Sequence, residues 1–108
     1  MKIEELLDIF EGKTTIQVEA IRENYIGKEI VIEGQISDIS DKIFVVFAIN
    51  AYRSLNKYAF IDYNKEVFKK QLLDYSSGTN VIIKAKLVKI RSNSHVIFDY
   101  FLNSITKA

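Results

Sequence analysis

Apolar residues recur every three or four positions in three stretches of the chain, which is the spacing of one face of an α-helix. The first stretch is residues 2–11, which Gly12 ends, and the second is residues 14–27. The third is residues 64–78, with Asn64 as its N-cap and a length of about three turns. The pattern predicts two short helices at the start of the chain and one beyond its middle.

Elsewhere apolar and polar residues alternate, the period of a β-strand with one buried face. This period predicts five strands, over residues 28–40, 42–50, 57–63, 79–91 and 95–102. In the first of them Gly34 lies between Ile32 and Ile36 on the apolar face. A glycine inside a strand tolerates a distorted backbone and lets another strand approach closely, so we expect a bulge or a bend at Gly34.

The second predicted strand is apolar on both of its faces. Ile43, Val45 and Phe47 alternate with Phe44 and Val46, so neither face is expected to be freely solvated.

The order of these elements and the residues that open two of the strands resemble a known fold. Gly27 and Lys28 open the first strand, and Gly34 recurs within it. The fourth strand follows Gly78 and carries Val81 and Ala85. In these features residues 28–105 resemble the OB-fold, and more narrowly the small bacterial OB domains of the tRNA-anticodon-binding-like type. The resemblance implies a mainly β (α+β) protein, a five-stranded barrel with a helix between strands three and four.

A chain of 108 residues is the size of one small domain. We expect residues 28–108 to form the barrel and residues 1–27 to form a helical cap within the same structural domain. Five short strands can close on themselves and remove their free edges. Phe68 and Leu72 of the third helix would then plug the open end of the barrel.

Composition limits the chemistry that the chain carries. No cysteine and a single histidine exclude disulfides and thiolate metal sites, so we expect no metal and no cofactor. Glu4, Glu5 and Asp8 interrupt the first apolar stretch, and no apolar run approaches membrane-spanning length. We therefore expect a cytoplasmic protein without a membrane partner. The net charge is +1, divided between −3 over residues 1–27 and +4 over the remainder.

The stretch EGKTTIQ, residues 11–17, contains Gly-Lys-Thr, the tripeptide with which one type of phosphate-binding loop ends. Such a loop needs a glycine five positions before Gly12, but this chain has Leu7 there. The loop also needs a strand before it, but the pattern predicts a helix over residues 2–11. Thr14 and Gln17 instead have the spacing of a capping box. We interpret the stretch as the start of the second helix.

OB-folds commonly bind nucleic acid on the outer face of strands two and three and on the adjoining loops. If Ala59 and Ile61 point inward, the outer face carries aromatic residues with cations in the neighbouring turns. Bases stack on such rings while the cations meet phosphates. The candidate contacts for single-stranded nucleic acid are Phe44, Arg53, Lys57, Tyr58, Phe60, Lys89, Arg91 and His95.

Two alternatives remain open at this point. The apolar stripes of the two N-terminal helices need a surface to pack on, and that surface could be Phe44, Val46, Tyr58 and Phe60. Lys84, Lys86 and Lys89 could form a basic stripe that contacts phosphates, or they could simply form the solvated side of the fourth strand.

No spacing typical of a catalytic site is present, so we expect no enzyme activity. The main hypothesis is a noncatalytic module that binds single-stranded DNA or RNA. The alternative is a module that binds a protein partner or forms a homo-oligomer through its apolar barrel surface, which the low net charge favours.

Overall fold

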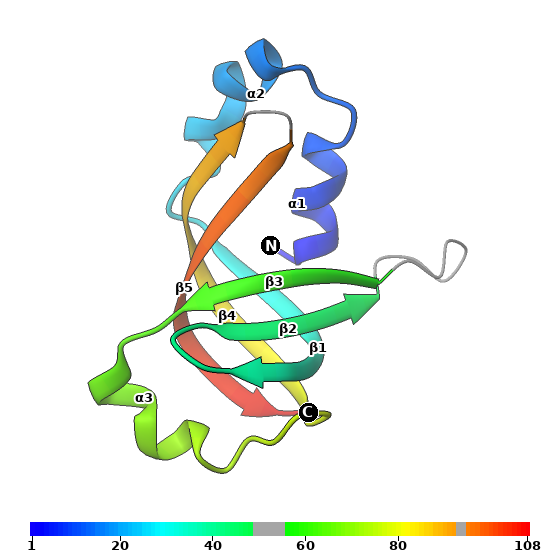
Figure 1. The fold of residues 1–108 in the computed structure, drawn as a ribbon. Coiled ribbons are helices and arrows are strands. Elements are labelled where there is room, and N and C mark those ends of the chain that lie inside the picture. Colours follow the sequence, from blue (N-terminus) through cyan, green and yellow to red (C-terminus); the bar gives the residue numbers. More distant parts are fainter. Residues whose placement is uncertain (49–55, 93–94) are drawn as a thin grey trace.

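The structure, a computed structural model, describes residues 1–48, 56–92 and 95–108, and its strands close into a barrel (Figure 1). The strands are β1 (Glu29–Ile39), β2 (Ile43–Ala48), β3 (Asn56–Asp62), β4 (Asn80–Ser92) and β5 (Val96–Lys107). Their order around the barrel is β1-β2-β3-β5-β4, and all pairs are antiparallel except β3–β5. The barrel predicted from the sequence is confirmed.

In the described ranges three α-helices accompany the barrel, and one of them lies between β3 and β4 as predicted. They are α1 (Ile3–Phe10), α2 (Thr15–Ile21) and α3 (Lys65–Leu72), and the 3-10 turn η1 (Arg22–Asn24) follows α2. The Asn64 side chain caps α3 by accepting from two backbone N–H groups. The prediction of three turns was too long, because the backbone after Leu72 tightens into i→i+3 turns at Asp74 and Tyr75.

Helix α3 lies at the lower end of the barrel in Figure 1 and covers it. Leu72 is buried and Phe68 packs against the core, as the plug prediction required. Gln71 and Tyr75 extend this contact, since both side chains donate to the backbone carbonyl of Ile105 on β5.

Two bulges change the inward register of the long β4–β5 hairpin. Val88 has no partner between the pairs Leu87–Tyr100 and Lys89–Asp99, and Asn103 is likewise extra on β5. A bulge adds one residue to one strand, so side chains three apart can both point inward. Leu102 and Ile105 are buried in this way. The strand predicted to end at residue 102 therefore continues to Lys107.

Gly34 lies where β1 changes partner, from β4 to β2. A Cβ added there would come within 2.4 Å of the Val46 carbonyl oxygen, so the predicted close approach of another strand is confirmed. The register shift of β1 lies elsewhere, between Ile36 and Asp38.

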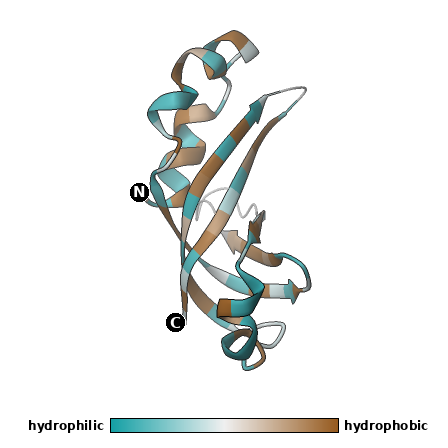
Figure 2. Cartoon of the chain, turned by 90° about the vertical axis from the view of Figure 1, so that its left-hand side faces the viewer, coloured by the Kyte–Doolittle hydropathy of each residue, from teal (hydrophilic) through white to brown (hydrophobic). Residues whose placement is uncertain are grey.

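The N-terminal helices pack along the β4–β5 hairpin, which stands above the barrel with alternating apolar and polar bands (Figure 2). The Phe10 ring at the end of α1 meets Tyr25 and Phe98 edge-on, at centroid distances of 5.5 and 5.4 Å. The capping box at the start of α2 is confirmed. The Thr14 hydroxyl accepts from the Gln17 N–H, and the Gln17 side chain accepts from the Thr14 N–H.

Candidate nucleic-acid interface

Three aromatic rings form a cluster on the outer face of β2 and β3, which we call the aromatic face (Phe44, Tyr58 and Phe60). Ala59 and Ile61 point into the core, and the residues between them therefore point outward. Phe44 stacks on Phe60 with centroids 4.7 Å apart and lies 5.3 Å from Tyr58. The predicted orientation of β3 is correct, and three of the candidate residues lie together.

The alternative that the N-terminal helices cover this cluster was wrong. Tyr58 is 62% exposed and Phe60 is 55% exposed. Helix α1 buries Ile3, Leu6 and Phe10 elsewhere, against the core and the β4–β5 hairpin. The expectation that neither face of β2 is freely solvated is confirmed, because one face is buried and Phe44 and Val46 on the other face are half-buried.

A groove of about 470 Å³ runs beside the aromatic face, between the edges of β3 and β5. Because β3 and β5 pair only at Ile61–Tyr100 and Asp62–Phe101, the two strands diverge above those pairs. Residues 57–60 line one side of the groove and residues 96–100 line the other. We call this hollow the β3–β5 groove; α1 closes its inner end with Ile3 and Leu7.

The charged residues of the β3–β5 groove are Lys42, Lys57, Arg91 and Asp99. Three cations and one carboxylate give the groove a positive balance. Arg91 and Asp99 form a bidentate ion pair, with Nε–Oδ2 and Nη2–Oδ1 distances of 2.9 and 2.8 Å. Lys42 lies 3.6 Å from the Asp62 carboxylate at the other side of the aromatic face.

Tyr100 lies at the bottom of the groove and is 3% exposed. Burial, and to a smaller degree the neighbouring Asp99 carboxylate, raises the pKa of the Tyr100 phenol far above its ordinary value. The phenol therefore stays neutral and keeps its O–H donor at physiological pH.

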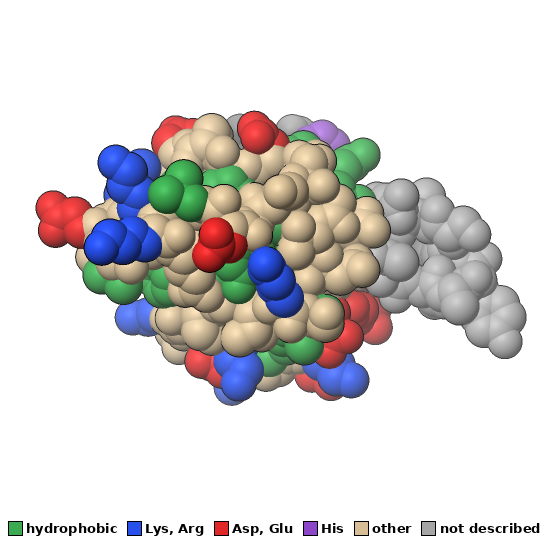
Figure 3. All heavy atoms as spheres, turned by 90° about the horizontal axis from the view of Figure 1, so that it is seen from below, with side chains coloured by type: hydrophobic (Ala, Val, Ile, Leu, Met, Phe, Trp, Pro, Cys, Tyr) green, Lys and Arg blue, Asp and Glu red, His purple; other side chains and the backbone are tan. Residues whose placement is uncertain are grey.

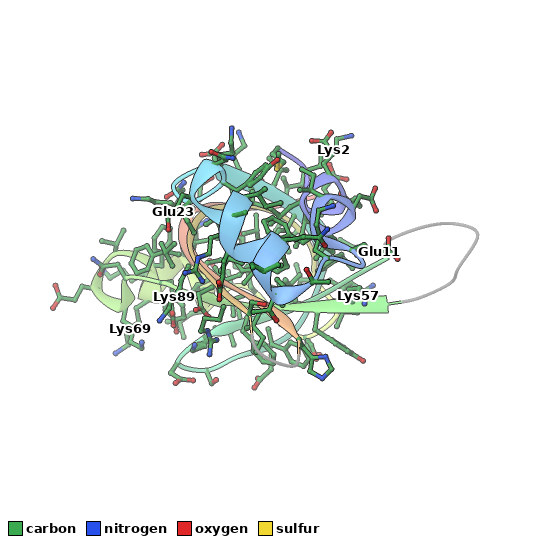
Figure 4. The ribbon with its side chains drawn as sticks, turned by 90° about the horizontal axis from the view of Figure 1, so that it is seen from above. Lys2, Glu11, Glu23, Lys57, Lys69 and Lys89 are labelled. Carbon is green, nitrogen blue, oxygen red and sulfur yellow. The ribbon has the colours of Figure 1, made fainter. Side chains whose placement is uncertain are left out.

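Two further candidates, Lys89 and His95, are not among the residues that line the groove. Seen from above, Lys57 and Lys89 lie well apart (Figure 4), although Lys89 pairs with the groove residue Asp99 across the β4–β5 hairpin. His95 is exposed next to the first residue of β5. Arg53 lies outside the described residues.

Lys42, Ile97 and Asp99 line the groove although the sequence did not indicate them as candidates. The alternation along β5 puts Ile97 and Asp99 on one face. In the hairpin Ile97 pairs with Arg91 and Asp99 pairs with Lys89, and this pairing with two candidate cations is the signal that could have indicated them.

Two other parts of the surface are less suited to a polyanion. A hollow of about 510 Å³ at Gly34 is lined by Glu33, Gln35 and Asn80 and has no lysine or arginine among its described lining residues. On the end covered by α3, acidic and basic side chains are interspersed (Figure 3). Among the described residues, a hollow beside α3 combines Tyr63 and Tyr75 with a single cation, Lys69, and an acid, Asp38. The β3–β5 groove combines its aromatic residues with three cations.

Within the described residues no three His, Cys, Asp or Glu side chains lie close enough to hold a metal ion. No helix in that part of the chain is long and apolar enough to cross a membrane.

Neither a protein-family model nor a curated protein sequence matches the chain. Solved structures do. The mitochondrial single-stranded DNA-binding protein Rim1 from S. cerevisiae aligns with a TM-score of 0.62 at 15% identity, over 75% of this chain and 93% of that one. The small single-stranded DNA-binding protein of Streptomyces coelicolor aligns with a TM-score of 0.51 at 11% identity, over 76% and 93%.

A third similar structure is an assigned aspartyl-tRNA synthetase from Leishmania major Friedlin. Its TM-score is 0.50 at 15% identity, and the match covers 95% of this chain and 25% of the synthetase. Identities this low establish the architecture alone. The chain has the OB-fold, as the sequence resemblance implied.

Proposed function

We propose that this protein binds single-stranded nucleic acid, without catalysing a reaction on it, through the aromatic face and the β3–β5 groove. The observation that carries the proposal is the exposure of Tyr58 and Phe60 beside Lys57 and Arg91. Rings that remain in solvent have a free surface on which bases can stack, and adjacent cations neutralise the phosphates that follow.

Similar proteins support the ligand class. Two of the structures that share this fold are described as single-stranded DNA-binding proteins. Because fold alone does not determine function, the proposal depends on the residues of the groove.

Low net charge predicts modest affinity. Asp99 pairs with Arg91 and Asp62 pairs with Lys42, so two of the three groove cations are partly neutralised before a phosphate arrives. Few phosphate contacts mean few released counterions, so we expect a shallow dependence of affinity on salt.

Fluorescence anisotropy with labelled single-stranded DNA, single-stranded RNA and a duplex of the same sequence tests the proposal. We expect both single strands to bind at low salt, more tightly than the duplex, and to weaken as salt rises. Absence of binding at high micromolar protein would contradict it.

A second candidate function is association with a protein, including another copy of this chain. The observation that favours it is the group of exposed apolar side chains at Tyr58, Phe60, Ile97 and Phe101. Light scattering distinguishes the two functions, because self-association raises the average mass with concentration in the absence of nucleic acid. A monomer at all concentrations counts against self-association.

A further inference from the structure

The Tyr100 hydroxyl meets the β3–β5 groove without a partner from the described residues. Tyr100 is 3% exposed and lines the groove, and no hydrogen bond joins its hydroxyl to another described side chain or backbone group. Throughout the described ranges no side-chain oxygen or nitrogen is sealed from solvent without a partner. The hydroxyl is therefore not sealed in the core, and we infer that a ligand reaches it from the groove that Tyr100 lines. Buried tyrosine hydroxyls normally find a partner, so this one is available to a ligand.

The walls above Tyr100 are apolar and partly aromatic. Tyr58 and Phe60 flank the groove on the β3 side, and Ile97 and Phe98 flank it on the β5 side. A volume of about 470 Å³ is within the roughly 300–1,000 Å³ typical of small-molecule sites. This shape suits a flat apolar ring system with polar atoms at its edge.

Arg91 and Asp99 at the rim of the groove place hydrogen-bond donors next to hydrogen-bond acceptors. Arg91 uses two of its five N–H groups on Asp99, and the carboxylate keeps further lone pairs. A guanidinium beside a carboxylate therefore presents a donor and an acceptor side by side. The edges of nucleobases carry the complementary arrangement of acceptors and donors.

We propose that the β3–β5 groove holds one unstacked nucleobase of a bound strand, with its polar edge at the Tyr100 hydroxyl and at the Arg91–Asp99 pair. The inference rests on the proposed function and adds a defined position to it. Neighbouring bases stack on the aromatic face, while this one base enters the groove.

The test combines Tyr100→Phe with an abasic scan. Tyr100→Phe removes only the unpartnered hydroxyl, so we expect binding of a mixed-sequence single strand to weaken by about 2- to 10-fold, the factor expected for one hydrogen bond. Tyr63→Phe is the matched control. It removes a hydroxyl that donates to the Ser40 carbonyl outside the groove, and binding should not change.

The abasic scan uses the wild-type protein, so it does not depend on how a variant folds. A short oligonucleotide carries one abasic site at each position in turn. We expect one position to lose much more affinity than the others, and Tyr100→Phe to cause no further loss at that position. Equal losses at all positions, or wild-type binding by Tyr100→Phe, would overturn the inference.

Two further results separate this inference from the function on which it rests. If Tyr58→Ala and Phe60→Ala weaken strand binding while Tyr100→Phe and the scan show nothing, the inference fails and the proposed function stands. Nucleoside monophosphates are titrated as the alternative source of a base. We expect them to bind more weakly than the strand, and equally tight binding of a monophosphate would overturn the assignment to a strand.

Discussion

The rings of Phe44 and Phe60 stack on each other with their planes 9° apart and their centroids 4.7 Å apart. Phe44 is half-buried, so it holds the exposed Phe60 ring in one orientation. A ring that is already ordered loses little conformational entropy when a ligand stacks on it. The aromatic face is therefore preorganised for stacking.

Replacing the exposed rings by alanine should weaken strand binding more than it weakens the fold. Base stacking on an aromatic side chain contributes about 1–3 kcal/mol, so Tyr58→Ala and Phe60→Ala should each weaken binding at least about 5-fold. Both side chains are more than half exposed, and the free energy of unfolding should change by less than about 1 kcal/mol. Anisotropy and urea unfolding measure the two effects.

The control for these variants is Leu73→Ala, which shortens an exposed apolar side chain on the α3 end of the molecule. It should bind like wild type. If Leu73→Ala weakened binding as much as Phe60→Ala, the aromatic face would have no special role.

Lys57 lines the groove and Lys89 does not, so the two lysines form a matched pair of neutralising substitutions. Lys57→Gln should reduce the slope of log affinity against log salt by about 1 and weaken binding to all sequences alike. Lys89→Gln should leave the slope unchanged. Salt titrations of both variants measure this, and an equal reduction by both would mean that the phosphate contacts of the strand are not confined to the groove.

The alternation of apolar residues was sufficient to predict the barrel but not its details. It located all five strands because inward and outward side chains differ in polarity. It failed after Leu102, where the bulge at Asn103 shifts the period by one residue. The aromatic cluster followed from Ala59 and Ile61 pointing inward. The exposure of this cluster could not be predicted, because the position of α1 depends on contacts of Phe10 with residues distant in the sequence, such as Phe98.

Gly34→Ala should destabilise the protein through a steric clash. The added Cβ would lie 2.4 Å from the Val46 carbonyl oxygen, which belongs to backbone and cannot swing away. We expect a loss of about 1–3 kcal/mol, the usual cost of overpacking. Gly12→Ala is the comparison, since nothing lies within 4 Å of its added Cβ and only its φ of +69° opposes the change. Thermal unfolding measures both, and equal destabilisation would show that β2 moves aside at Gly34.

Alkaline pH should destabilise the protein through Tyr100. Burial raises the pKa of this phenol in the folded state, so its contribution to stability is complete below the ordinary pKa of about 10. Above that pH the unfolded chain ionises first and the contribution is lost as pH rises towards the folded pKa. Tyr100→Phe should remove this part of the decline. Urea unfolding between about pH 8 and 11 measures the free energy of unfolding of both proteins. If it fell with pH equally in wild type and Tyr100→Phe, the result would contradict the burial of the phenol.

The most direct test of the account is to map where a single strand binds. Amide chemical shifts of the ¹⁵N-labelled protein are recorded while a short single-stranded oligonucleotide is added at low salt. We predict the largest changes at Tyr58, Phe60, Arg91 and Ile97, with little change along α3. Changes concentrated on α3, or no changes at millimolar oligonucleotide, would contradict binding at the aromatic face and the β3–β5 groove.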